Sequence, residues 1–393
     1  MRTLLFFLSC SAVMGYSFNV EVEADSAILI NAKTGKVLYE KEASTLRYPA
    51  SVTKVATALF ILEEKNQDLS QMISPSDDAL LITKASSKQD NFDLFPSYRL
   101  EHDGYHIGIK KGEILPFWAA FYGMLIGSGN DAANVVAESC SLSIVSFIDE
   151  MNLFLKKIGC ENTHFMNPHG LHHPDHYTTA YDLALIAKKA LESAFFREIV
   201  SSLAYVYPQT NRSKEKRISH NNRLIKQSSE FYYPNAIGIK TGYTKYARNT
   251  LIAAAEKEGR ELIAVILGAA TKKQRYQNAI KLFETAFKEE KKQHVVVLKD
   301  RMFLKSLDGA KTKLKAHVKD DMLISYYPSE KPENIKAYIH WNEQKLPIEK
   351  NQPVGIIFVL SSEREVLAEK KLYSAENVTK TFFRALKDFL LFK

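Results

Sequence analysis

The spacing of apolar residues predicts a strand-rich start followed by a long helical region. Two short apolar runs at 26–31 and 36–40 flank Thr34-Gly35, a turn pair, and predict a β-hairpin. A buried helix is predicted at 52–65, and helical periodicity recurs further along at 116–126, 130–140, 144–158 and 179–192. Residues 84–113 are polar and irregular, so we expect a surface excursion there.

The period changes after Pro234. Short apolar runs predict strands, and a helical pattern at 274–288 follows them; the strands are 237–239, 250–255 and 261–267. Strands at both ends of a helical region predict one α/β (α+β) domain over 18–290, whose sheet joins the first hairpin to the late strands. The helices between them then form an inserted subdomain.

The following region, 291–373, is dominated by β patterns separated by turn residues such as Asp308-Gly309. Its candidate strands are 294–298, 322–326, 335–341, 354–360 and 366–372. This spacing predicts a second, small, all-β domain of a β-sandwich-like kind.

Both ends of the chain carry patterns typical of export and membrane attachment. Residues 1–17 combine Arg2, a short apolar run and small residues, which predicts a secretory signal peptide; a buried first strand is the alternative. Residues 374–393 predict an amphipathic membrane-anchoring helix, with packing on the β domain as the alternative. Its apolar face would hold Val378, Phe382, Phe383, Leu386, Phe389 and Leu390. Together the two ends predict a periplasmic protein peripherally attached to the membrane.

Composition and net charge exclude only a few classes of protein. Hydrophobic residues make up 46% and charged residues 25%, which excludes a disordered or fibrous chain. The net charge of +8 permits an anionic partner, but the sequence holds no zinc-finger or ribonucleoprotein motif, so no nucleic acid is predicted. Cys10 lies in the predicted signal; Cys140 and Cys160 could pair or remain thiols.

Candidate chemistry begins with Ser51 and Lys54, which stand three residues apart and so share one face of a helix. Serine becomes nucleophilic when a nearby base takes its proton, and a lysine can act so when burial or a second cation lowers its pKa. Ser213 and Lys216 repeat the spacing inside a charged run that is typical of a solvated loop. We therefore place the nucleophile at Ser51.

Two further triplets also occur more than once. Lys-Thr-Gly occupies 33–35, the predicted hairpin turn, and 240–242, next to a predicted core strand. Ser-x-Asn occurs three times, and only the copy at 128–130 lies at a tight junction between two helices; the others are at 17–19 and 219–221.

Each motif residue then receives a role. Ser128 relays a proton towards the leaving amine, and Asn130 binds substrate and orients Lys54. Lys240 supplies positive field, and Thr241 offers a hydroxyl to a substrate carboxylate. Backbone N–H groups of Ser51 and Tyr243, which follows Gly242, would stabilise an oxyanion.

The three motifs in this order resemble those of the penicillin-binding proteins, most closely the low-molecular-weight D-alanyl-D-alanine carboxypeptidases. They are Pro49-Ala50-Ser51-Val52-Thr53-Lys54, Ser128-Gly129-Asn130-Asp131-Ala132 and Lys240-Thr241-Gly242. The segments 162–165, 167–171 and 177–182 are similar to the family's central stretch, so the resemblance covers about 24–290 in detail.

This resemblance implies a penicillin-binding, β-lactamase-like transpeptidase fold and a serine enzyme without a cofactor. Its substrate would be the peptidoglycan stem pentapeptide, which loses its terminal D-alanine through an acyl-enzyme on Ser51, and β-lactams would acylate the same serine. A D,D-endopeptidase and a β-lactamase on the same fold are the alternatives. A non-catalytic wall-binding protein is a further one.

Three features qualify the resemblance. Tyr243 replaces a histidine that is frequent in relatives, and Arg248 stands where glycine is usual. Five histidines cluster beside Asp175, but their spacing matches no zinc motif, so we predict no metal site; they are His164, His169, His172, His173 and His176. Asp131 is expected to cap the helix that starts beside it.

Overall fold

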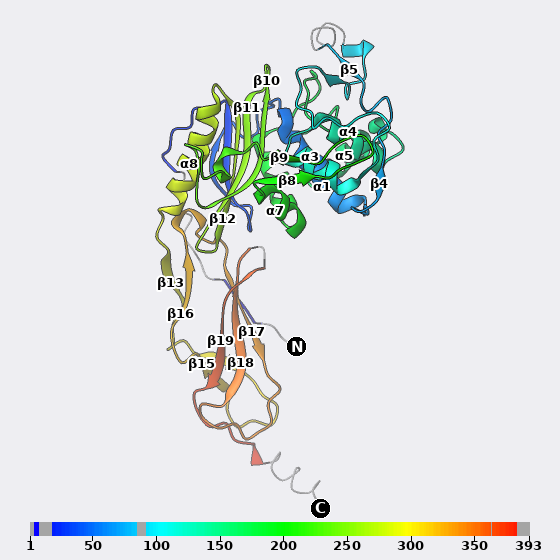
Figure 1. Cartoon of the computed structure of the whole chain (residues 1–393). Helices are drawn as coiled ribbons and strands as arrows, with labels where there is room; N and C mark the ends of the chain where they lie inside the picture. The colour runs from blue at the N-terminus through cyan, green and yellow to red at the C-terminus, as the bar shows by residue number, and fades with distance from the viewer. Residues whose placement is uncertain (1–3, 8–17, 85–91, 363, 383–393) are drawn as a thin grey trace, which may run out of the picture. The chain divides into compact units, whose positions relative to one another are not determined.

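The computed structural model describes residues 4–7, 18–84, 92–362 and 364–382. The chain divides into two compact units (Figure 1). The larger comprises Ser17–Lys288, and the smaller comprises Glu289–Lys393 together with Met1–Tyr16.

A five-stranded antiparallel sheet organises the larger unit, with strand order β10-β11-β12-β2-β3. Its strands are β2 (Ser26–Asn31), β3 (Val37–Lys41), β10 (Ala236–Thr244), β11 (Arg248–Lys257) and β12 (Arg260–Ala269). Strand β12 pairs with β2, so the first hairpin and the late strands share one sheet, as predicted. The α/β class with a helical subdomain is confirmed.

Both faces of this sheet are buried because alternate side chains along each strand meet a different layer. Leu251 and Ile266 pack with Phe283 of α8 (Lys272–Phe287) on one face. Ile252 and Ile263 belong to the core shared with the helical subdomain on the other face (Figure 1). Two-sided burial explains why these strands are almost continuously apolar.

The predicted helices of the subdomain are confirmed. They are α1 (Thr53–Glu64), α3 (Phe117–Leu125), α4 (Asn130–Cys140), α5 (Ile144–Lys157) and α6 (Ala180–Ala190). All residues of α1 from Thr53 to Ile61 are buried, which makes it the central helix of the subdomain. Cys140, at the end of α4, and Cys160 are free thiols.

The spacing of apolar residues did not predict several short elements. They are α7 (Ala194–Ser201), the hairpin β8 (Ala204–Tyr207) with β9 (Lys216–Ser219), and the two-residue strands β4 (Met72–Ile73), β5 (Ile82–Thr83), β6 (Leu100–Glu101) and β7 (Leu115–Pro116). One-turn 3₁₀ helices stand at Ala50–Val52, Phe92–Leu94, Arg223–Ile225 and Pro328–Glu330. Such brief segments contain too few residues to show a period.

The surface excursion predicted at 84–113 is wrong at several described positions. Tyr98, Leu100, Ile107, Ile109 and Glu113 are buried there. The Asp131 carboxylate, itself buried, accepts N–H bonds from Ile107, Gly108 and Ile109 at 2.8–3.0 Å.

The expected capping role of Asp131 therefore needs correction. Its carboxylate also accepts the N–H of Ala132, but Gly129 is the N-cap residue of α4 and no side chain caps that end. Asp131 instead fastens the 107–109 segment to the start of α4 through these hydrogen bonds. A negative charge at this position also interacts favourably with the helix dipole.

The smaller unit is an all-β domain, as predicted. Its six-stranded sheet has the order β1-β17-β18-β19-β15-β14, and β13 pairs with β16 separately. The bounds are β1 (Leu4–Phe7), β13 (Lys292–Val297), β14 (Phe303–Lys305), β15 (Leu314–His317), β16 (Met322–Tyr326), β17 (Lys336–Trp341), β18 (Pro353–Leu360) and β19 (Val366–Ser374). Strands β14 and β15 were not predicted, because each is short and interrupted by lysine.

The two ends of the chain are described only in part. Leu4–Phe7 pairs with β17, whereas residues 8–17, which hold the expected cleavage site, lie outside the described residues. The signal peptide therefore stays a prediction.

The start of the expected C-terminal helix differs from the prediction. Val378 is buried in the β domain and bridges Ile348, and Lys380 bridges Ala310, so this stretch is extended. Residues 383–393 lie outside the described part. Elsewhere in the described chain, no single helix has the length and apolar character of a bilayer span; only α4 and α5 taken together do, and they are bent by 84°.

We predict that Asp131→Ala lowers the free energy of unfolding by about 3 kcal/mol, because it leaves several buried N–H groups without an acceptor. Urea denaturation measures the change. Asp149→Ala, at an exposed position on α5, is the matched control and should lie within about 0.5 kcal/mol of the wild type. Equal midpoints for the two variants would show that Asp131 is not an anchor.

Candidate active site

Ser51 lies in the 3₁₀ turn Ala50–Val52, immediately before α1. The turn is fastened on both sides, since Thr53 Oγ1 donates to the Ala50 carbonyl at 2.9 Å and Thr250 Oγ1 donates to the Pro49 carbonyl at 2.8 Å. Ala50 has a φ of +53°, an uncommon value for a residue with a side chain. The serine is thus presented by a strained, rigid turn.

Lys54, one helical turn later, is completely buried beside Ser51. Its Nζ lies 3.1 Å from Ser51 Oγ, and it donates to Asn130 Oδ1 at 2.7 Å and to the His169 carbonyl at 2.6 Å. These partners point the amine at the serine and leave it little freedom to turn away.

Burial is the main cause that holds the pKa of Lys54 well below its usual value, and the positive charge of Lys240 lowers this pKa further. Asp131 acts in the opposite direction and raises it. A lysine whose pKa is depressed in this way can be neutral at physiological pH and accept a proton.

Lys240 itself is buried on β10 and donates to the Thr241 carbonyl at 3.1 Å. Burial, followed by the charge of Arg275, lowers the pKa of Lys240 to about 7. The site therefore holds two buried lysines, and each is disfavoured in its charged form.

Ser128 and Asn130 approach from the junction between α3 and α4. Ser128 is nearly buried and has a φ of +60°, so its backbone is held in an uncommon conformation. Asn130 opens α4, and its backbone N–H donates to the Tyr105 carbonyl at 2.7 Å. A side chain at Gly129 would meet Asp131 Oδ1 at 2.8 Å, which explains the glycine between them.

Gly242 brings β10 against the nucleophile. A Cβ atom at this position would lie 2.9 Å from the Ser51 backbone nitrogen and would collide with Thr250 Oγ1. Only glycine permits this close approach, which aligns the edge of β10 with the Ser51 N–H. Tyr243 follows with 57% of its surface exposed, so its ring does not pack under the serine.

A cavity of about 620 Å³ opens over these residues. Ser51, Ser128, Thr241, Gly242 and Tyr243 line it, so five of the predicted site residues share one surface. Lys54, Asn130 and Lys240 lie buried behind it. The structure thus brings together all eight residues that the sequence singled out.

The cavity also contains cations that the sequence argument missed, namely Arg223, Lys226, Lys272 and Arg275. Arg275 is buried, and its guanidinium donates to the Gly242 carbonyl at 3.0 Å and to the Tyr276 hydroxyl at 3.1 Å. One signal was available: Arg275 shares a helix face with Ala279 and Leu282, which are apolar.

The repeated motifs separate clearly in the structure. Most of the charged run 212–217 is exposed, as expected, but Ser213 is buried. Lys216, of the second Ser-x-x-Lys, lies on β9 and donates to the Ile107 carbonyl at 2.6 Å. Lys-Thr-Gly at 33–35 is the β2–β3 turn, where Gly35 has a φ of +73°. Asn221 of a rejected Ser-x-Asn lines the same cavity and donates to the Gly127 carbonyl.

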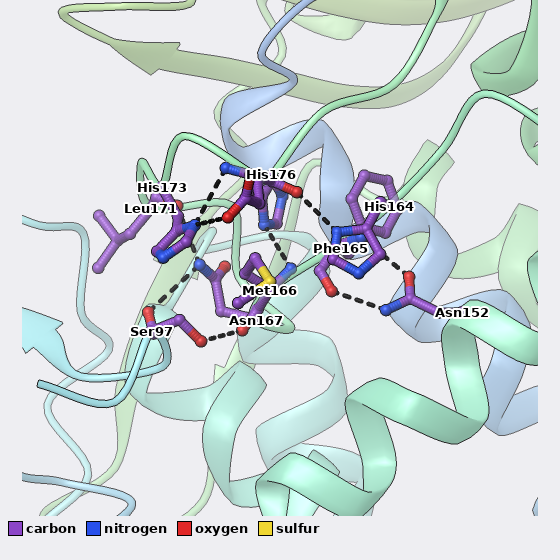
Figure 2. A network of polar contacts seen from close by, with 10 residues as sticks. Ser97, Asn152, His164, Phe165, Met166, Asn167, Leu171, His173 and His176 are labelled. Atoms are coloured by element: carbon purple, nitrogen blue, oxygen red, sulfur yellow. Dashed lines mark hydrogen bonds and ion pairs between the residues drawn. The ribbon is translucent and has the colours of Figure 1, made fainter. Parts of the chain in front are cut away.

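The histidine-rich segment is held by polar contacts within itself and to Ser97 and Asn152 (Figure 2). His176 Nδ1 accepts the Met166 N–H at 3.0 Å, so its Nε2 carries the proton and donates to Thr53 Oγ1 at 2.9 Å. Thr53 in turn donates to the Ala50 carbonyl. This chain of hydrogen bonds connects His176 to the turn that presents Ser51.

His169 is fastened in the same segment. Its ring Nε2 lies 3.0 Å from the Tyr98 carbonyl, and its Nδ1 accepts the Leu171 N–H at 3.1 Å. The His169 carbonyl is the group that accepts from Lys54. Within the described residues, no three histidine, cysteine or acidic side chains are grouped to hold a metal ion.

Arg248 begins β11 with a φ of +55°, which explains why a glycine would fit this position more easily. Its guanidinium forms an ion pair with Asp25. The side chain thus contacts the residue that precedes β2 and does not line the 620 Å³ cavity.

Comparison with known proteins identifies the family of this chain. The family model of D-alanyl-D-alanine carboxypeptidase matches residues 13–271, and that of the penicillin-binding protein 5 C-terminal domain matches residues 291–380. The D-alanyl-D-alanine carboxypeptidase DacF of Bacillus subtilis is 32% identical, over 94% of this chain and 91% of that protein.

Solved structures agree in fold. A D-alanyl-D-alanine carboxypeptidase from Mycobacterium tuberculosis aligns with a TM-score of 0.56 and 27% identity, over 68% of this chain and 92% of that one. The carboxypeptidase DacD of Francisella tularensis shares the fold over 95% of this chain and 98% of its own, with a TM-score of 0.61 and 23% identity. The chain therefore belongs to the D-alanyl-D-alanine carboxypeptidase family of serine peptidases.

Proposed function

We propose that the protein removes the terminal D-alanine from peptidoglycan stem pentapeptides through an acyl-enzyme on Ser51. The observation that carries the proposal is the buried Lys54 amine, 3.1 Å from Ser51 Oγ and depressed in pKa. Ser51 Oγ attacks the carbonyl of the penultimate D-alanine while Lys54 Nζ takes its proton. Ser128 passes a proton to the leaving amine, D-alanine departs, and water then cleaves the ester on Ser51.

Charge that develops on the attacked carbonyl oxygen needs fixed donors. The close approach of Gly242 to the Ser51 nitrogen supports an oxyanion hole made by the backbone N–H groups of Ser51 and Tyr243. Tyr243 then needs only its main chain, which accounts for the tolerance of tyrosine where relatives often carry histidine.

The cationic side of the cavity suits the free carboxylate of the substrate. Arg223, Lys226, Lys272 and Arg275 face one acidic lining residue, Glu230. Thr241 lines the same cavity and can donate its hydroxyl to the same carboxylate. A bound carboxylate is therefore held on the leaving-group side of the scissile bond.

β-Lactams carry a carboxylate beside a strained amide, so we propose that they acylate Ser51 in the same orientation. Within the described residues, no carboxylate forms a hydrogen bond with Ser51 or Lys54 that would activate a deacylating water. A long-lived adduct, rather than a fast β-lactamase cycle, is the expected outcome.

We predict that labelled penicillin gives one covalent adduct on the wild type and that Ser51→Ala abolishes both this adduct and D-alanine release. Ser213→Ala, from the second Ser-x-x-Lys copy, is the matched control and should retain both. Intact-protein mass spectrometry and a D-alanine assay on a free pentapeptide measure the two signals, and a cross-linked dimer in the same assay reports endopeptidase activity. An undiminished adduct on Ser51→Ala would falsify the proposal.

We predict that Lys240→Gln moves the acid limb of the pH profile for acylation to higher pH. Protonated Lys240 lowers the pKa of Lys54, so its loss raises the pKa of Lys54 and the neutral base appears only at higher pH. Stopped-flow acylation by a fluorescent penicillin, normalised to each maximum, measures the shift. Lys245→Gln, at an exposed position of the adjacent turn, should leave the limb in place, and identical profiles for all three proteins would contradict this electrostatic role.

We propose further that the protein is exported to the periplasm and attached peripherally to the membrane by its C-terminal helix. Support comes from the apolar pattern of residues 382–393 and from Phe382, whose side chain is 76% exposed. A lipid surface accommodates apolar side chains of this kind.

We predict that the mature chain floats with vesicles of mixed zwitterionic and anionic lipid, whereas a chain ending at Phe382 stays in the dense fraction. Both proteins should release D-alanine from soluble pentapeptide at similar rates, because Ser51 lies in the other unit. If the two chains float equally, the protein binds the vesicles through a surface other than residues 383–393.

A further inference from the structure

A second cavity of about 350 Å³ lies beside the segment that carries the nucleophile. Tyr48, three residues before Ser51, and Tyr246, three residues after Tyr243, both line it. The cavity is thus built from the same two segments as the active site, although none of the eight site residues faces it.

Its walls are unusually rich in tyrosine. Tyr48, Tyr177 and Tyr246 line it, and Tyr246 keeps 46% of its surface exposed. His172 holds two of these rings, stacking on Tyr246 with centroids 3.9 Å apart and meeting Tyr48 edge-on at 4.6 Å. Aromatic faces are therefore fixed in place before any ligand arrives.

Polar groups stand at the same walls. Arg47 donates from Nε to Ser26 Oγ at 3.0 Å, and Asp25 is paired with Arg248, so both side chains are oriented. Among the described residues, the hydroxyls of the three tyrosines have no hydrogen-bond partner and can meet a ligand. Fixed aromatic faces with a few convergent polar groups are the make-up of a small-molecule site.

A pyranose ring matches this combination. Its axial C–H groups form an apolar face that packs on the electron-rich face of an aromatic ring. Its equatorial hydroxyls and N-acetyl group point sideways, where Arg47, Asp25 and the phenol hydroxyls can donate and accept. The Asp25 carboxylate is paired with Arg248, so Arg47 keeps its positive charge and can donate to a sugar hydroxyl or to the acetamide oxygen.

Distance supports the same occupant. Consecutive Cα atoms are 3.8 Å apart, so the Tyr48 Cα lies within about 11 Å of the Ser51 Cα. In a stem peptide roughly three residues separate the acylated D-alanine from the sugar, which is about 10 Å when extended. The two cavities share no lining residue, so the second cavity is available to the sugar-bearing end of the stem when the cationic cavity takes its carboxylate end.

We propose that this second cavity binds the N-acetylmuramyl sugar to which the stem peptide is attached. The inference rests on the proposed function of Ser51 and extends it, since the enzyme would then prefer stems that still carry glycan over free peptides. Tyr246 supplies the main stacking face, and Arg47 and Asp25 orient the ring by its polar edge.

The test compares D-alanine release from an N-acetylmuramyl pentapeptide and from the same pentapeptide acetylated at its N-terminus. For the wild type we expect kcat/KM to be about fivefold higher with the sugar, mainly through a lower KM. Tyr246→Leu should bring the ratio of the two values close to one, and Tyr246→Phe, which keeps the aromatic face, should restore it. Because both substrates react at Ser51, the ratio cancels any general loss of activity that a substitution causes.

Tyr181→Leu is the matched control, because Tyr181 is an exposed tyrosine that lines neither cavity, and its ratio should equal that of the wild type. A wild-type ratio near one, with the free pentapeptide hydrolysed normally, would overturn this inference and leave the function of Ser51 intact. A ratio that survives in Tyr246→Leu would also overturn it. Failure of both substrates and of penicillin acylation would instead overturn the proposed function.

Discussion

The structure depends on keeping the amine of Lys54 buried next to Ser51. Removing a lysine from water is costly in its charged form, so its pKa falls, and a lysine that is neutral at working pH is what a serine nucleophile needs. The amine still requires partners, and Asn130 and the His169 carbonyl supply them from two different parts of the helical subdomain. A third segment, β10, adds the charge of Lys240.

This requirement explains features remote from the catalytic atoms. The His169 carbonyl is useful only if its loop is rigid, and the ring of His169 bonds the backbone of Tyr98 and Leu171 for that reason. Gly170 lies so close to the Ala50 carbonyl that a side chain there would collide with it. The histidines that raised the question of a metal site therefore hold in place the turn that presents Ser51.

Sequence periodicity was sufficient for the longer helices and for the strands of one sheet that joins the first hairpin to the late strands, because long buried elements repeat their apolar residues. It failed at positions that are buried by one particular tertiary contact and not by a repeating apolar face. Residues 107–109 lie in a stretch that is polar and irregular as a whole, but Asp131 satisfies their backbone N–H groups from a neighbouring helix. Val378 fits a helical pattern, yet it pairs with Ile348 across the β domain. For the site, short motifs were sufficient for the residues around Ser51, whereas Arg275 belongs to no motif and reaches the cavity only through tertiary packing.

The charges in the catalytic cavity also connect substrate binding to the strength of the base. In the free enzyme Arg275 disfavours the charged form of Lys240, and protonated Lys240 disfavours the charged form of Lys54. A substrate carboxylate that enters among these cations offsets their field and raises the pKa of both lysines. Under the proposed function, the cations of the empty site keep the pKa of Lys54 low, and a bound carboxylate raises this pKa and makes the amine a stronger proton acceptor. Under the proposed function, the same carboxylate would position the peptide and strengthen the base, which a site with a single isolated lysine could not do.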